Sequence, residues 1–89
     1  MFRIFKNETT NATSEALSSF NGQHTVACWG TFGGATVKLQ LSLDGTKWFD
    51  IDDLTFTDEG IVNAYLGKDV KVRGVISGGS SASLNLSVA

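Results

Sequence analysis

The chain has 89 residues, of which 42% are hydrophobic and 18% charged, and its net charge is −2 at pH 7. This length is that of one domain, and the apolar content supports a single core and excludes an intrinsically disordered chain. The small negative charge excludes a chain that is drawn as a whole to nucleic acid or to an anionic membrane.

The first residues, 1–6, alternate apolar and basic side chains and predict a short strand or an arm. Residues 7–21 follow, and nine of these fifteen are Asn, Ser or Thr, which indicates a solvated extended segment, strand-like over 13–20. A helical turn at Glu15–Leu17 is the competing interpretation, because these residues form helices well. We therefore expect an N-terminal arm and polar segment at 1–22, able to add a strand, before a core domain at 23–89.

The strongest β signal lies at residues 25–32 and 35–43, which flank Gly33-Gly34. Two glycines between alternating runs predict a two-residue hairpin turn of the primed type. Such a turn sets a register in which partners sum to 67, so that three pairs of small or apolar residues face the core and three pairs face outward. The inner pairs are Cys28 with Leu39, Val26 with Leu41 and Gly30 with Val37; the outer pairs are Trp29 with Lys38, Ala27 with Gln40 and Thr25 with Ser42.

Further strands follow at 48–51, 60–66, 70–76 and around 84–88, separated by turns at Asp44-Gly45, 67–69 and 77–81. Trp48 and Ile51 are three residues apart, so both face inward only across a bulge. Ten glycines, no proline and many short alternating runs predict an all-β fold, a single antiparallel β-sandwich of about six to eight strands. The expected core is Val26, Cys28, Val37, Leu39, Leu41, Trp48, Val70, Val72, Ile76, Leu84, Leu86 and Val88.

The sequence offers little for catalysis or for metal binding. The only histidine, His24, stands four residues from the only cysteine, Cys28, which along a strand is about 13 Å and too far for a catalytic pair. A single cysteine also excludes an internal disulfide and suits synthesis in a reducing cytosol. Asp50, Asp52 and Asp53 lack the spacing of a calcium loop. We expect no enzyme activity, no catalytic residues, no cofactor and no metal.

Charges and aromatic residues suggest where the domain makes contacts. Residues 44–59 hold six acidic residues against one lysine, a local charge of −5, and residues 68–73 have a local charge of +2. The outward Trp29 is covered by the N-terminal segment, lies on the Lys38 stem, or belongs to a contact surface. Three basic residues beside one tryptophan are too few to predict nucleic-acid binding. The candidate interface residues are Phe2, Ile4, Phe5, Trp29, Lys38, Lys71 and Arg73.

The runs at 30–40 (GTFGGATVKLQ), 42–48 (SLDGTKW), 70–73 (VKVR) and 84–86 (LNL) give the chain a resemblance. Over 23–89 it resembles the small β-sandwich virion proteins of tailed phages. The resemblance implies a capsid decoration (cement) protein, located in the virion after synthesis in the host cytoplasm, whose partner is the major capsid protein or another virion protein. A neck, tail or fibre position remains open, as do assembly with copies of itself, the host and the copy number. A small carbohydrate-binding module is the alternative of another class.

No signal-like apolar run follows Met1, and no stretch approaches membrane-spanning length, so we expect no membrane partner.

Overall fold

The computed structural model describes residues 2–18, 20–79 and 82–89. Residue 1 of the predicted arm, residue 19 of the polar segment and residues 80–81 of the predicted Gly/Ser turn lie outside the described residues. Over the described ranges the chain forms eight strands and no helix, which confirms the all-β prediction. The strands are β1 (Phe2–Glu8), β2 (Ala12–Thr13), β3 (Gly22–Thr31), β4 (Thr36–Ser42), β5 (Phe49–Phe56), β6 (Gly60–Leu66), β7 (Lys71–Ser77) and β8 (Ser83–Val88).

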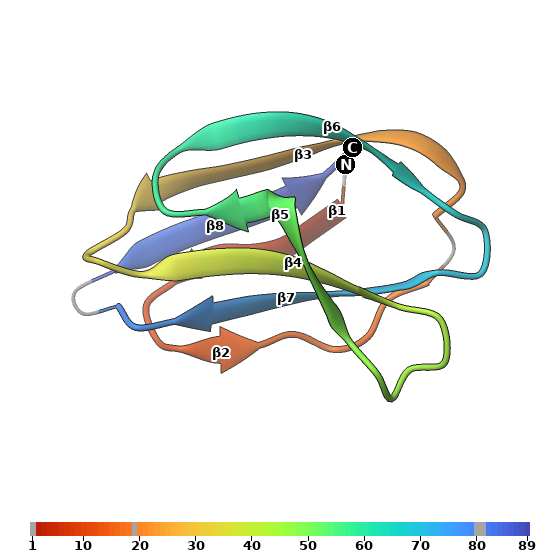
Figure 1. The fold of residues 1–89 in the computed structure, drawn as a ribbon. Coiled ribbons are helices and arrows are strands. Elements are labelled where there is room, and N and C mark those ends of the chain that lie inside the picture. Colours follow the sequence, from red (N-terminus) through yellow and green to blue (C-terminus); the bar gives the residue numbers. More distant parts are fainter. Residues whose placement is uncertain (1, 19, 80–81) are drawn as a thin grey trace.

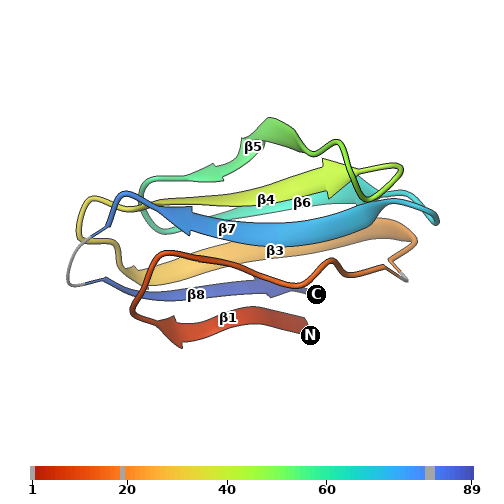
Figure 2. The ribbon, with the colours of Figure 1, turned by 90° about the horizontal axis from the view of Figure 1, so that it is seen from below.

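Two antiparallel sheets of four strands make up the sandwich. Sheet A has the order β1-β8-β3-β6, and sheet B has the order β2-β7-β4-β5. Figures 1 and 2 show the two sheets stacked face to face, with β1 and β2 on one side of the stack and β5 and β6 on the other. The core lies between the sheets, where the inward side chains of alternate strand positions meet.

Most of the predicted core residues are buried. Nine of them are at most 3% exposed, while Leu41 and Val70 are half-buried and pack at the margin of the core. The nine are Val26, Cys28, Val37, Leu39, Val72, Ile76, Leu84, Leu86 and Val88. Seven further residues complete the core: Phe5, Phe32, Ala35, Leu54, Phe56, Leu66 and Ala82. Alternation along the strands therefore assigned the inner face correctly.

The predicted hairpin at Gly33-Gly34 is wrong. The tight turn exists, because the Ala35 N–H donates to the Phe32 carbonyl at 2.9 Å and both glycines have positive φ, 56° and 83°. The strands on either side, however, belong to different sheets: β3 pairs with β6 and β8, and β4 pairs with β5 and β7. Of the residues expected to pair on the inner face, Val26, Cys28, Val37 and Leu39 are buried between the two sheets instead, an arrangement that satisfies the same alternation.

The N-terminal segment is extended along both sheets. β1 pairs with β8 of its own chain, and β2 pairs with β7. Beyond β2, Leu17 and Val72 exchange two backbone hydrogen bonds of 2.7 and 2.8 Å. The helical turn is wrong, and the strand-like interpretation of 13–20 is confirmed only in part: among the described residues of this segment, strand pairing is limited to β2 and to the bridge at Leu17.

Candidate interaction surfaces

Trp29 lies on the outer face of sheet A, as its alternation with Cys28 predicted. Its partner on β8 is Asn85, and the guanidinium of Arg3 lies 5.5 Å from the centre of its ring. Lys38 stands in the other sheet, so the Lys38 stem does not cover the indole. The contact that the structure shows comes from Arg3 in the predicted arm, before the Asn/Ser/Thr-rich stretch that was expected to cover the ring, and the indole is half-buried.

The carboxamide of Asn85 connects β1 to β8 on the outer face of sheet A by hydrogen bonds. Its Oδ1 accepts hydrogen bonds from Arg3 Nη2 at 2.9 Å and from the Asn7 backbone N–H at 3.1 Å. Asn85 is only 6% exposed, and a buried amide without partners would be costly. The sequence interpretation missed this residue, whose only signal was a polar side chain between Leu84 and Leu86.

The three apolar residues of the arm divide between core and surface. The register of β1 against β8 shifts between Arg3 and Phe5, which lets Ile4 and Phe5 both face inward. Phe5 is 6% exposed and joins the core, whereas Phe2 is 47% exposed and meets the ring of Phe20 edge-on at 6.3 Å. All three border a groove of about 410 Å³ between β1 and β2, with Leu17 on its far side. The arm is thus anchored within its own chain.

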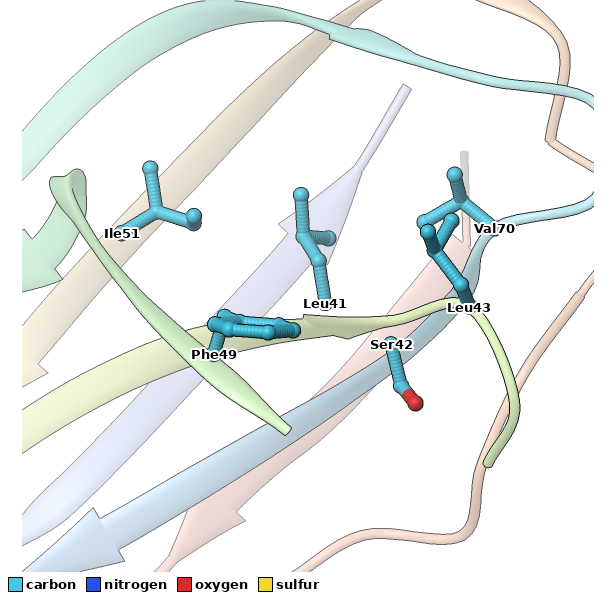
Figure 3. A pocket seen from close by; sticks show the side chains of 6 residues that line it. All are labelled: Leu41, Ser42, Leu43, Phe49, Ile51 and Val70. Atoms are coloured by element: carbon cyan, nitrogen blue, oxygen red, sulfur yellow. The ribbon is translucent and has the colours of Figure 1, made fainter. Parts of the chain in front are cut away.

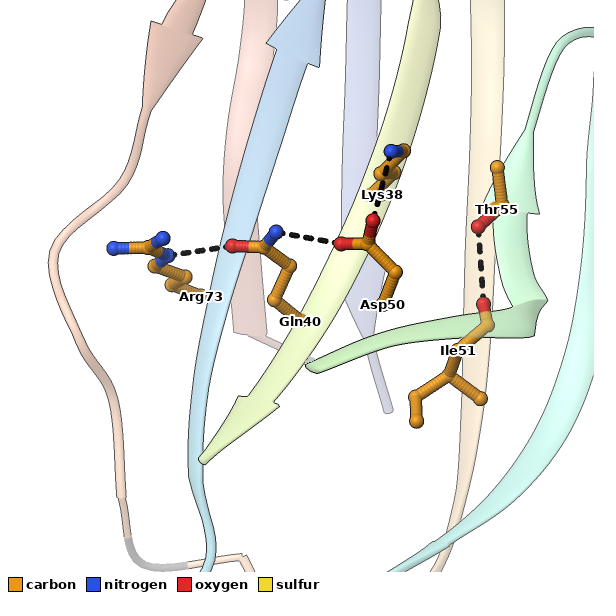
Figure 4. Close-up of polar contacts among 6 residues, drawn as sticks. All are labelled: Lys38, Gln40, Asp50, Ile51, Thr55 and Arg73. Atoms are coloured by element: carbon orange, nitrogen blue, oxygen red, sulfur yellow. Dashed lines mark hydrogen bonds and ion pairs between the residues drawn. The ribbon is translucent and has the colours of Figure 1, made fainter. Parts of the chain in front are cut away.

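The predicted basic face, Lys38, Lys71 and Arg73, lies on the outer side of sheet B and holds a row of paired polar groups. Lys38 Nζ lies 3.0 Å from Asp50 Oδ2, and Gln40 Nε2 donates to Asp50 Oδ1 at 2.6 Å. Arg73 Nε donates to Gln40 Oε1 at 2.7 Å (Figure 4). These hydrogen bonds, first from Gln40 and then from Lys38, lower the pKa of Asp50. Lys38 and Arg73 are therefore already paired with polar groups of their own chain, and Lys71 is half-buried at the end of this face.

Trp48 is not in the core, contrary to the prediction. The guanidinium of Arg73 lies 4.3 Å from the centre of its ring, which places the indole on the outer side of sheet B, half-buried. The irregular pairing that a bulge would create does occur, between the partners of Lys38 and Gln40 on β5. Trp48 precedes β5, however, so strand alternation does not orient it.

An apolar hollow at the end of the sandwich was missed by the sequence interpretation. It measures about 200 Å³ and lies on the inner side of sheet B, where β4 ends and β5 and β7 begin; its lining is Leu41, Ser42, Leu43, Phe49, Ile51 and Val70. Figure 3 shows Leu41, Leu43, Ile51 and Val70 on one side of β4, with Ser42 pointing away. Leu43 is 76% and Phe49 51% exposed. The alternation of Leu43 with Leu41 was the available signal.

The chain around this apolar hollow is acidic. β5 and the turn before it carry Asp44, Asp50, Asp52 and Asp53 as exposed residues, against the single lysine Lys47. Lys47 Nζ lies 5.7 Å from the centre of the Phe49 ring. The backbone N–H groups of Lys47 and Thr46 donate to Asp44, at 2.9 and 2.8 Å, and lower its pKa. These acidic residues follow the lining residues along the chain but do not line the hollow, and Asp50 is already paired with Lys38 on the outer side of sheet B.

The two residues weighed for nucleophilic chemistry are held in structural positions. Burial, and secondarily the charge of Glu59, raise the pKa of the Cys28 thiol to about 12, so it is protonated at neutral pH. His24 Nδ1 lies 3.3 Å from the Ala89 carbonyl oxygen. Across residues 2–18, 20–79 and 82–89, no three His, Cys, Asp or Glu side chains gather to hold a metal ion. That part of the chain also contains no helix long and apolar enough to span a membrane.

Comparisons with protein-family models, curated proteins and solved structures found no match to this chain.

Proposed function

We propose that this protein is a non-enzymatic structural component of a tailed-phage particle and that it decorates the capsid by binding the major capsid protein. The observation that carries the proposal is the apolar hollow, at which Leu43 and Phe49 are exposed. The resemblance of residues 23–89 to small virion sandwich proteins supplies the biological setting.

The apolar hollow has the composition of a protein contact. Interfaces draw most of their energy from a few apolar or aromatic anchors that enter the partner's surface. Full burial of a leucine or phenylalanine side chain contributes about 1.5–3 kcal/mol, so Leu43 and Phe49 suffice to anchor a modest interface.

The arginine-covered tryptophans have a different role in this proposal. Arg3 lies over Trp29 and Arg73 over Trp48, so both indoles already have partners within the chain. The aromatic side chains that are largely exposed are Phe2, Phe49 and Tyr65, on three different strands. A sugar-binding platform needs neighbouring exposed aromatic rings on one face, and these three, the largely exposed ones among the described residues, come from separate strands, so they do not favour the carbohydrate-binding alternative.

The number of copies in each particle tests the role. Purified virions are analysed on a quantified gel, with the band identified by mass spectrometry. Hundreds of copies support decoration, because a decoration protein follows the many subunits of the shell. A copy number of about a dozen or fewer matches the symmetric rings of the neck and tail and refutes decoration. Absence from the particle refutes the structural role altogether.

Paired substitutions test the surface. Phe49→Ser and Phe2→Ser each remove an exposed phenylalanine, 51% and 47% exposed, on different surfaces. In a binding assay on undecorated shells, Phe49→Ser weakens binding at least tenfold, since the loss of one buried aromatic anchor costs about 2 kcal/mol or more. Phe2→Ser leaves binding within about twofold, as an exposed side chain outside the contact costs little. The reverse result would move the contact surface from the apolar hollow to the N-terminal strand.

A further inference from the structure

The sandwich has four edge strands, and three of them are protected against pairing with another chain. β2 has only two residues. β1 shifts register twice against β8 and contains Asn7 in a left-handed conformation, with φ 48°. β5 is irregular against β4 and carries three aspartates. Short, bulged or charged edges are the ways in which sheet proteins prevent strand addition.

β6 has none of these protections. Its seven residues, Gly60–Leu66, carry no charge and pair with β3 without a shift from Gly22↔Leu66 to Cys28↔Gly60. Ile61 and Tyr65 are 70% and 66% exposed on the outer face. No described strand lies beyond β6 in sheet A, as Figure 1 shows. A long, regular, apolar edge of this kind is a template for another strand.

The register identifies which backbone groups of β6 face this open edge. Thr25 and Ala89 exchange backbone hydrogen bonds of 2.9 and 2.8 Å, so Thr25 points its polar groups toward β8. Hydrogen-bonding direction alternates along an antiparallel strand, so Val26 and its even-numbered neighbours point toward β6. Their partners on β6 are the even-numbered residues. The N–H and C=O groups of the odd-numbered residues Ile61, Asn63 and Tyr65 therefore face outward from the edge.

The sequence of β6 is complementary to itself. In an antiparallel pair of two β6 strands centred on Asn63, Ile61 lies opposite Tyr65 of the other copy and Val62 opposite Ala64. Aliphatic–aromatic and small apolar cross-strand pairs stabilise sheets, and no like charges meet within the strand. Beyond the strand ends, Asp58 and Glu59 of one copy come next to the turn of the other copy that carries Lys68. The same turn also carries Asp69, but pairing about Asn63 puts Asp58 opposite Lys68 of the other copy, and these two charges attract, twice by symmetry.

We infer that two copies of this chain associate through β6, pairing antiparallel about Asn63 so that their A sheets become one continuous eight-stranded sheet. The contact is symmetric and closed, so it stops at two copies. It satisfies the three pairs of outward backbone groups on each chain and covers Ile61 and Tyr65. The inference stands independently of the virion role, because it uses neither the resemblance nor the apolar hollow.

A proline at residue 63, on the two-fold axis of the pair, tests the proposed dimer. The Asn63 N–H faces the open edge, so Asn63→Pro removes a donor for the second copy and none for β3. Light scattering and sedimentation should give the wild-type chain a mass of about 19 kDa, twice the 9.5 kDa of one chain, and Asn63→Pro a mass of one chain. Tyr65→Lys puts a charge on the edge without changing the backbone, so it should weaken association as well. If circular dichroism shows that Asn63→Pro is unfolded, the mass of Tyr65→Lys tests the dimer in its place.

Leu43→Ser is the matched control, because it removes an equally exposed apolar side chain from the apolar hollow and should leave the dimer intact. A wild-type chain that stays monomeric up to about 1 mM, where even weak pairs associate, overturns the inference. So does a dimer that survives both Asn63→Pro and Tyr65→Lys, or one that only Leu43→Ser disrupts.

A charge exchange tests the antiparallel register. Asp58→Lys or Lys68→Asp alone places like charges near each other at both ends of the pair and should raise the dissociation constant roughly two- to thirtyfold. The double variant restores opposite charges and should return the constant to within about twofold of the wild-type value. Additive losses in the double variant would refute this register.

Discussion

Each of the two tryptophan rings has an arginine side chain lying over it. Arg3 and Arg73 each stack on an indole, and a contact of this kind at a half-exposed site contributes about 0.5–1 kcal/mol. Each arginine also donates a hydrogen bond to a carboxamide, of Asn85 or of Gln40. The outward direction of Trp29 followed from alternation in the sequence. Its partner did not, because Arg3 reaches it only through the pairing of the first strand with the last.

Gly30 stands where the backbone of Ser83 leaves no room for a side chain, so its substitution should be severe. It has a φ of +124°, and a Cβ at this position would overlap the carbonyl oxygen of Ser83. We expect Gly30→Ala to lower the free energy of unfolding by about 3 kcal/mol or more, since backbone strain and a clash with backbone add together. Guanidinium-induced unfolding measures the loss.

Gly22 is the control for the conformational part of this loss. It has a similar φ of +110°, but a Cβ there would have no atom within 4 Å. Gly22→Ala should therefore cost only the backbone strain, about 1–2 kcal/mol. Equal losses in the two variants would show that the approach of Ser83 has no energetic weight.

Among the elements, β1 shows how an apparent arm becomes part of the domain. It pairs with β8, which makes β8 an inner strand of sheet A and explains why Asn85 and Ser87 are buried on its outer side. Its bulge turns Ile4 and Phe5 together toward the core, against Gly74 of the opposite sheet. The alternation of apolar and basic residues in the sequence was compatible with a free arm, because the bulge that buries two successive residues leaves no local signature.

The phenylalanines of β1 should therefore differ in their contribution to stability. Phe5→Ala leaves a cavity in the core and should lower the free energy of unfolding by about 3–5 kcal/mol. Phe2→Ala removes a side chain that is 47% exposed, so a loss of about 1 kcal/mol or less is expected. Unfolding curves of the two variants under the same conditions provide the comparison. A Phe5→Ala variant as stable as the wild-type chain would mean that β1 is not docked in solution.

At the scale of the whole molecule, the sandwich is held by strands that are distant in sequence. β3 bonds to β8 and to β6, and the first strand bonds to the last. Such non-local pairing makes folding slow and leaves few elements that are stable alone. Cys28 lies in the core between the sheets at 1% exposure, so its thiol reports whether the two sheets separate.

Cys28 should also make the stability depend on alkaline pH. Its pKa rises from 9.0 to about 12 in the folded chain, mainly through burial, so the folded state keeps a proton that the unfolded state loses. The resulting stabilisation is complete below about pH 9 and is lost as the pH rises toward about 12. Unfolding measured at about pH 8 and about pH 10 should show a smaller free energy at the higher value, by about 1 kcal/mol.

Cys28→Ala supplies the control, because it removes the titrating group and should flatten this part of the pH dependence. Labelling of the native thiol by a disulfide reagent should proceed at the rate of global unfolding. Rapid labelling under native conditions would show that the sheets open locally and would contradict a cooperative sandwich.

Alternation and glycine turns, which are local properties of the chain, predicted most of the strands, most of the inner face and the outward direction of Trp29. They missed the second half of β5, with buried Leu54 and Phe56. The tertiary structure alone decided which strands pair. Val26 and Val37, for example, face inward whether their strands lie side by side or in opposite sheets, so alternation could not distinguish a hairpin from a crossing between sheets. It also decided the candidate surfaces: the apolar hollow is lined by residues of sheet B and the loops at its end, and β6 is an edge because no described strand other than β3 pairs with it.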